Sequence, residues 1–96
     1  MTKAPPGIAE ETVLFFARGH RLQHDRVRDL WIVQAPEKAF VIEGAAPHIL
    51  RLLDGKRSVG DIIQQLANEF SAPREVIAKD VLALFSELTE KNVLQI

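Results

Sequence analysis

The chain contains no cysteine among its 96 residues. Disulfide bonds, thiol nucleophiles and thiolate metal sites are therefore excluded, which fits a reducing compartment. The chain also lacks any apolar run approaching the roughly 20 residues that a membrane-spanning helix needs. Its first eleven residues, MTKAPPGIAEE, include no apolar stretch of signal-peptide length. These absences favour a cytoplasmic protein with no membrane partner.

An excess of basic residues is also missing. Twelve Lys and Arg residues stand against thirteen Asp and Glu residues, which gives a formal net charge of −1. Domains dedicated to DNA usually carry a clear basic excess, because neutralising phosphates supplies much of their affinity. The overall charge therefore argues against nucleic acid as a partner. Apolar residues, in contrast, make up 47% of the chain, which indicates a packed core and a single domain.

Residues that could carry catalysis or hold a cofactor are few. His20 and His24 fall in a region that we expect to form a strand and a turn, and His48 stands apart from them. Asp25 is adjacent to His24, but nothing in the sequence fixes the geometry that a metal site with these imidazoles would need. The segment 54–58 has one glycine and no preceding strand, unlike a phosphate-binding loop. We therefore expect no catalytic residues, no metal and no organic cofactor.

Turn residues and apolar patterning predict an α+β, winged-helix-like domain over residues 13–96, preceded by a flexible tail over residues 1–12. The short apolar run at 13–16 fits either a strand or a short helix. A three-stranded antiparallel sheet is expected next. Its strands are predicted at 18–23, 30–35 and 39–42, with turns at 24–26 and 35–38.

Three helices are expected after the sheet. The first begins after Gly44 and ends at Gly55, with Pro47 tolerated in its first turn. The second runs from Ser58 to Phe70, and Asp61 has the spacing of a capping box. The third runs from Pro73 to about Glu90 and is capped by Ser71 or Ala72. Asn92 can take the left-handed conformation after that helix. We expect the last apolar residues to dock on the core: Val93, Leu94 and Ile96.

The second and third helices, joined by a short link, resemble a helix-turn-helix. A helix that reads DNA should offer basic and amide side chains near its start. The third helix offers Arg74 and Lys79 against four acidic residues: Glu75, Asp80, Glu87 and Glu90. These acids would repel phosphates, so the pattern favours a peptide ligand. A winged-helix transcriptional regulator is the alternative.

An extended peptide would find a suitable surface on this scaffold. A sheet ordered 1-2-3 leaves the strand at 38–42 with one unpaired edge, where a peptide can form main-chain hydrogen bonds. The third helix can wall a groove against that edge, although its whole apolar stripe could instead be core. The candidate peptide-binding residues are Lys38, Ala39, Phe40, Val41 and Ile42 on the strand and Ile77, Asp80, Val81, Leu84 and Phe85 on the helix.

Three stretches, residues 18–43, 45–67 and 76–94, carry a resemblance to a known family. Their most telling pieces are Arg18-Gly19, Arg21-Leu22, Ala35-Pro36-Glu37, Leu53-Asp54-Gly55 and Asp80-Val81. In this order and spacing they resemble the pyrroloquinoline quinone (PQQ) biosynthesis protein D family, PqqD. The chain departs from the family pattern at His20, at Glu43-Gly44 and at Asn92.

The resemblance implies a non-catalytic carrier that binds the precursor peptide of PQQ. Such a carrier presents the peptide to a radical S-adenosylmethionine (SAM) enzyme, which joins a glutamate to a tyrosine within it. Related recognition domains clamp a leader segment between the third strand and the third helix, as the edge and stripe suggest here. The Ala35-Pro36-Glu37 turn could serve the partner enzyme or only shape the hairpin. A recognition domain for a different modified peptide is a further alternative.

Overall fold

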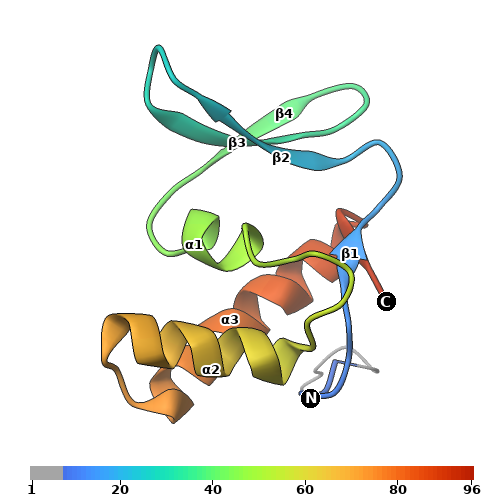
Figure 1. The fold of residues 1–96 in the computed structure, drawn as a ribbon. Coiled ribbons are helices and arrows are strands. Elements are labelled where there is room, and N and C mark those ends of the chain that lie inside the picture. The colour runs from blue at the N-terminus through green and yellow to red at the C-terminus, as the bar shows by residue number, and fades with distance from the viewer. Residues whose placement is uncertain (1–7) are drawn as a thin grey trace.

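A three-stranded sheet packs over a layer of helices (Figure 1). The computed structural model describes residues 8–96. The sheet contains β2 (Arg21–Asp25), β3 (Leu30–Gln34) and β4 (Ala39–Ile42) in the order β2-β3-β4, and both pairings are antiparallel. The helices are α1 (Ala46–Leu50), α2 (Val59–Phe70) and α3 (Arg74–Glu90). The predicted fold class, a three-stranded antiparallel sheet followed by three helices, is confirmed.

A second, smaller sheet joins the two ends of the domain. β1 (Phe15–Phe16) pairs antiparallel with β5 (Leu94–Gln95). The apolar run at 13–16 therefore contributes a strand, not a helix, and this strand is separate from the three-stranded sheet. Val93 and Leu94 are buried, as expected. Ile96 is 57% exposed, so its predicted docking on the core is wrong.

The first predicted hairpin is shifted along the chain. β2 covers 21–25 instead of 18–23, and the turn covers 26–29 instead of 24–26. The backbone amide of His20 donates to the carbonyl of Ala17, which forms a turn where a strand was expected. The carboxylate of Asp25 accepts the amides of Val27 and Arg28. These local bonds hold the later turn because Asp side chains readily mimic a backbone turn.

The ends of the longer helices show the predicted caps with one exception. Ser58 and Asp61 form a reciprocal capping box, each side chain accepting the other's backbone amide at 3.1 Å. Asn92 takes a φ of 62°, as expected of a left-handed cap. The link between α2 and α3 differs, because Ser71 ends α2 with a φ of 50° and Pro73 is the residue that caps α3. The prediction of Ser71 or Ala72 as that cap was wrong.

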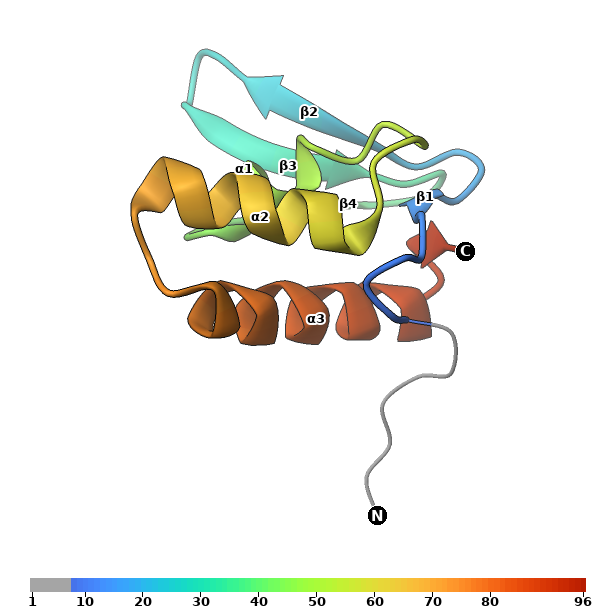
Figure 2. The ribbon, with the colours of Figure 1, turned by 60° about the horizontal axis from the view of Figure 1, so that its bottom comes forward.

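The core lies between the sheet and the helices, and α2 and α3 lie side by side beneath it (Figures 1 and 2). In the three-stranded sheet, the side chain of Val33 is fully buried, and those of Phe40 and Ile42 are half-buried. Each fully buried aliphatic or Phe side chain stabilises the fold by about 1.5–3 kcal/mol. Fully buried helical side chains form much of the core: Leu50, Val59, Ile62, Ile63, Leu66, Val81 and Phe85.

Residues 8–12 lie against the helices. The backbone amides of Val59 and Gly60 donate to the carbonyls of Thr12 and Glu10 at 2.8 and 2.7 Å. The Glu10 carboxylate also forms a two-pronged ion pair with Arg74, at 2.7 and 2.9 Å. In this stretch the structure differs from the expected tail, because the segment bonds to the starts of α2 and α3. Residues 1–7 of that expected tail lie outside the described residues.

Candidate functional site

β4 has one edge that no strand covers in the described part of the chain. On its other side β4 pairs with β3 through Gln34↔Ala39, Val33↔Phe40, Ile32↔Val41 and Trp31↔Ile42. The strand carries no charged side chain, and Val41 is 54% exposed. An uncovered apolar edge offers its amides and carbonyls to another extended segment. β4 is thus open to main-chain pairing.

The register decides which residues of β4 offer these groups. The backbone amide of Ala35 donates to the carbonyl of Lys38 at 2.9 Å, so these two residues form a hydrogen-bonded pair. Hydrogen-bonded and non-hydrogen-bonded pairs alternate along an antiparallel ladder. Phe40 and Ile42 therefore also bond to β3. The amides and carbonyls of Ala39 and Val41 point to the free edge.

A groove lies between β4 and the C-terminal half of α3. It contains a cavity of about 220 Å³. The strand side is formed by Phe40, Val41 and Ile42, and the helix side by Leu84 and Leu88. At one end of the cavity, Lys91 Nζ forms an ion pair with Glu87 Oε2 at 3.0 Å, one helical turn away. The lining is apolar apart from Glu87 and Lys91, which suits a peptide that buries apolar side chains there.

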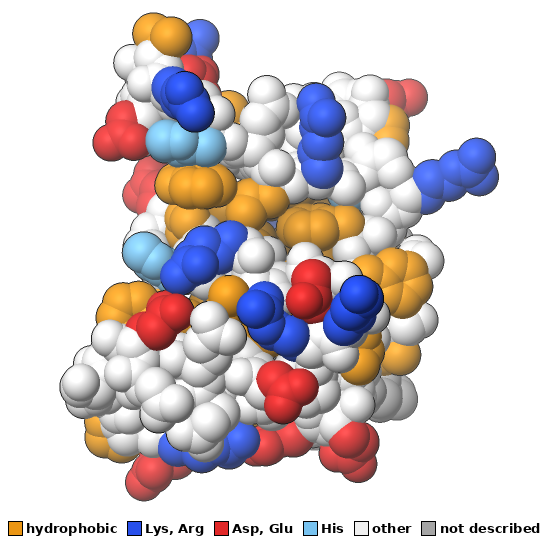
Figure 3. Space-filling model, viewed as in Figure 1, with side chains coloured by type: hydrophobic (Ala, Val, Ile, Leu, Met, Phe, Trp, Pro, Cys, Tyr) orange, Lys and Arg blue, Asp and Glu red, His pale blue; other side chains and the backbone are white. Residues whose placement is uncertain are grey.

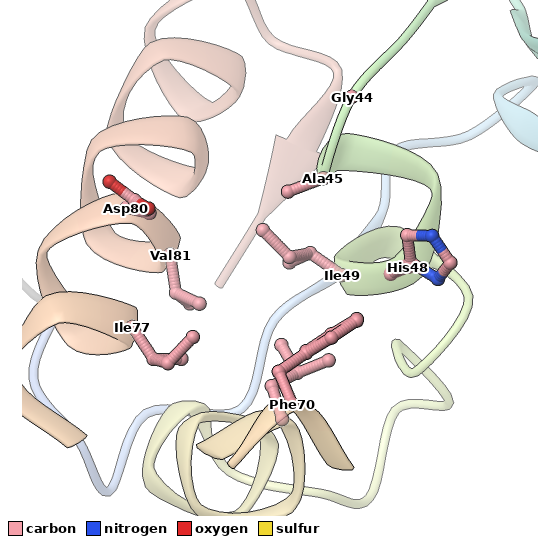
Figure 4. A pocket seen from close by; sticks show the side chains of 9 residues that line it. Gly44, Ala45, His48, Ile49, Phe70, Ile77, Asp80 and Val81 are labelled. Atoms are coloured by element: carbon pink, nitrogen blue, oxygen red, sulfur yellow. The ribbon is translucent and has the colours of Figure 1, made fainter. Parts of the chain in front are cut away.

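A second cavity, of about 330 Å³, lies further along α3 toward its N-terminus (Figure 4). Ile77 and Val81 enter it from α3, and Ile49 enters it from α1. Ala45 and His48 border it at the start of α1, and Phe70 comes from the end of α2. His48 meets the Phe70 ring edge to face at a centroid distance of 5.4 Å. Its lining is apolar apart from His48 and Asp80.

The candidate residues divide into four groups. Phe40, Val41, Ile42 and Leu84 come together in the first cavity, and Ile77, Asp80 and Val81 in the second. Lys38 and Ala39 are exposed at the start of β4, where the Lys38 Nζ lies 5.2 Å from the centre of the Phe40 ring. Phe85 lines neither cavity, because its side chain is fully buried in the core.

Several lining residues were not among the candidates. Leu88 is apolar, and its spacing of four residues from Leu84 could have identified it. Lys91 follows on the same face. Ala45, His48 and Phe70 had no local signal, because they come from other elements that only the tertiary fold brings to α3.

The surface charges form no field of one sign on the face shown in Figure 3, where Lys and Arg alternate with Asp and Glu over the helices. The described histidines are engaged locally: His24 bonds to Asp29 at 3.0 Å and stacks on Trp31, and His20 contacts the carbonyl of Arg18. Residues 8–96 hold no group of three or more His, Cys, Asp or Glu that could bind a metal. Within the same range, no helix has the length and apolar character to cross a membrane.

Comparisons with known proteins identify the family. Residues 30–94 match the family described as "Coenzyme PQQ synthesis protein D (PqqD)". The "PqqA binding protein" of Gluconobacter oxydans is 88% identical over 94 residues, which cover 98% of each chain. The "PqqA binding protein" of Rhizobium meliloti is 38% identical and covers all of this chain and 98% of its own.

Two solved structures are similar as well. One is the PqqD truncation of Methylobacterium extorquens PqqCD, described as a stand-alone recognition element for ribosomally synthesised, post-translationally modified peptides. It has a TM-score of 0.79 at 32% identity, and the match covers 93% of this chain and 95% of that one. The other is PqqD from Xanthomonas campestris, with a TM-score of 0.59 at 39% identity over 82% and 88% of the chains. This chain belongs to the PqqD family.

Proposed function

We propose that this chain binds the PqqA precursor peptide, which pairs as an added strand with the free edge of β4 and packs side chains against α3. The observation that carries the proposal is the uncovered edge at Ala39 and Val41 beside an apolar cavity walled by α3. Main-chain bonds to such an edge give affinity, and pockets for alternate side chains give specificity. Relatives named as PqqA binding proteins supply the identity of the peptide.

The chain acts in this proposal as a carrier without catalysis. It presents the bound peptide to a radical SAM enzyme, as membership of the PqqD family suggests. A peptide paired with β4 through one edge would keep its other edge free. That free edge would remain accessible to the enzyme. Mixing the chain, the peptide and the enzyme should give a complex on size-exclusion chromatography. A radical enzyme that processes the peptide equally well without the chain would contradict this part of the proposal.

An NMR titration tests the binding surface directly. The probe is the PqqA peptide of Gluconobacter oxydans, and the labelled protein is this chain. Amide signals of residues 38–42 and 77–88 should move together, because the ligand would contact the strand and the helix at once. A scrambled peptide of the same composition is the control. Shifts confined to residues 54–58, or equal shifts with the scrambled peptide, would contradict the proposal.

A further inference from the structure

We infer that the cavity bordered by α1, α2 and α3 is a second subsite for the same peptide: it takes a large apolar side chain, and Asp80 pairs with a cationic group beside it. This inference rests on the proposed function. It adds a recognition pattern, an apolar anchor next to a Lys or Arg, that the uncovered strand edge does not require.

The position of this cavity is the first argument. Both cavities have α3 as a common wall, and Asp80 and Leu84 lie one helical turn apart. The opposite walls are also continuous, since Ile42 ends the first cavity and Gly44 begins the second. A peptide paired with Val41 would reach Gly44 and Ala45 after about three or four further residues at about 3.3 Å each. The second subsite is therefore within reach of a chain already held on β4.

The shape and lining of the cavity are the second argument. Figure 4 shows Ile49, Ile77 and Val81 converging on one space, with the Phe70 ring below it. Its volume of about 330 Å³ accommodates a Leu, Phe or Trp side chain. Burying such a side chain contributes about 1.5–3 kcal/mol in general. An apolar lining with one charge at its border selects for an apolar group with a charged neighbour.

Asp80 is the third argument. Its side chain lies on α3 at the border of the cavity, and it is exposed. Within residues 8–96, no hydrogen bond or ion pair involves its carboxylate. The residues three and four positions away on the helix are Val76, Ile77, Ala83 and Leu84, so no base within α3 can reach it at helical spacing. By contrast, Glu87 in the first cavity is already paired with Lys91. The free negative charge thus favours a cationic ligand group at this end.

A charge reversal tests the pairing. Titrations of the Gluconobacter oxydans PqqA peptide are compared for wild type, Asp80→Lys, Asp80→Asn and Glu90→Lys. Glu90 is exposed on the same helix and borders neither cavity, so its variant controls for net charge. We expect Kd to rise about three- to tenfold for Asp80→Lys, less for Asp80→Asn, and under twofold for Glu90→Lys. The effect should shrink at 0.5 M salt, because screening weakens an exposed pair.

Changes in the peptide identify its two groups. Each Lys or Arg of the peptide is replaced in turn by Glu, and each large apolar residue by Ala. One of the Glu-substituted peptides should bind wild type more weakly than the original peptide does. The same substituted peptide should bind the Asp80→Lys protein better than it binds wild type. One Ala substitution close to that position should raise Kd about tenfold. In the protein, the Ala45→Trp side chain should fill the second cavity and weaken peptide binding. Ala83 is exposed on α3 outside both cavities, so Ala83→Trp should leave binding unchanged.

The outcomes separate the inference from the proposed function. If wild type does not bind the peptide, the proposed function fails. If wild type binds and Asp80→Lys, Asp80→Asn and Ala45→Trp all keep its Kd within twofold, the peptide does not use this subsite, while binding at β4 still stands. Loss of binding in Ala83→Trp to the same degree as in Ala45→Trp would also overturn the inference. Circular dichroism of each variant establishes that it is folded.

Discussion

The sheet has two edges, and they differ in nearly every respect that controls strand pairing. β2 reads Arg21-Leu22-Gln23-His24-Asp25, so four of its five side chains are polar. β4 reads Ala39-Phe40-Val41-Ile42, with no polar side chain. Charged edge strands discourage pairing with other chains, whereas an apolar, uncovered edge invites it. One sheet therefore combines a protected edge with a receptive one.

The surroundings of the two edges reinforce this difference. β4 borders a cavity whose other wall is α3, so a paired strand could also bury side chains. Beside β2, the exposed hairpin carries local polar contacts, including His24 to Asp29 and Asp25 to the amides of the turn. A free edge alone is thus an insufficient sign of a binding site. The edge matters where an apolar groove runs along it.

Proline substitutions on β4 should give the largest effects and test the register. Phe40→Pro removes a hydrogen bond to β3 and a half-buried ring, so it should lower the free energy of unfolding by about 3 kcal/mol or more. Val41→Pro removes an amide that faces the free edge, so the protein should fold but bind PqqA about tenfold more weakly. Chemical denaturation and calorimetric titration measure the two quantities.

Two variants control for this contrast. Val41→Ala shortens the same side chain but keeps the amide, and its affinity should stay much closer to that of wild type. His24→Pro places the ring on the free edge of β2, since the register alternates across β3. It loses the stacking on Trp31 but should leave Kd within twofold. Equal losses of affinity at positions 24 and 41 would remove the distinction between the edges.

A matched pair of leucines should give an intermediate effect. Leu84 lies in the groove beside β4, and Leu22 lies on β2; both are half-buried against the core. Either change to Ala should cost about 2 kcal/mol of stability, the lower end for buried leucines. Leu84→Ala alone should also raise Kd, by about fivefold. If Leu22→Ala weakens binding as much as Leu84→Ala, affinity follows stability and the groove has no special role.

The sequence predicted the open strand and the helix beside it, but not which part of the helical stripe faces the groove. Val81 and Phe85 are fully buried, whereas Leu84 and Leu88 are half-buried and line the cavity. All four are apolar, so hydrophobicity does not distinguish them. The packing of α2 and the sheet against α3 determines which of these side chains are buried and which line the cavity. Those contacts come from residues distant in sequence.

The sequence also did not predict the close contacts that two glycines make with residues distant in the chain. Gly19 and the Ala35-Pro36-Glu37 turn were two separate pieces of the family pattern, yet a Cβ atom on Gly19 would lie 2.8 Å from the Pro36 Cγ. A Cβ atom on Gly60 would likewise lie 3.2 Å from the backbone carbonyl of Glu10. These glycines allow close approach between segments. Pro36 therefore lies so close to Gly19 that a residue with a Cβ atom would not fit at position 19 without a shift.

The smallest expected effect concerns the ion pair between Glu10 and Arg74, which ties the start of α3 to residue 10 and borders neither cavity. The hydrogen bonds from Arg74 hold the pKa of Glu10 below its usual value of 4.5. A lowered folded-state pKa adds stability above the unfolded pKa, and that stability is lost as pH falls through the folded pKa. Wild type should therefore be slightly more stable than Glu10→Gln near pH 7, and the gap should close below about pH 4.5.

Denaturation curves at pH 7, 5, 4 and 3 measure this gap. Glu11→Gln is the control, because Glu11 is exposed and takes no part in the ion pair with Arg74. Its variant should follow wild type at each pH. Kd for PqqA at pH 7 should be the same in Glu10→Gln as in wild type, since the ion pair lies outside both cavities. A gap that stayed constant from pH 7 to pH 3 would show that the carboxylate charge is not its source. A rise in Kd would instead mean that the anchoring of α3 at its N-terminus shapes the groove beside β4.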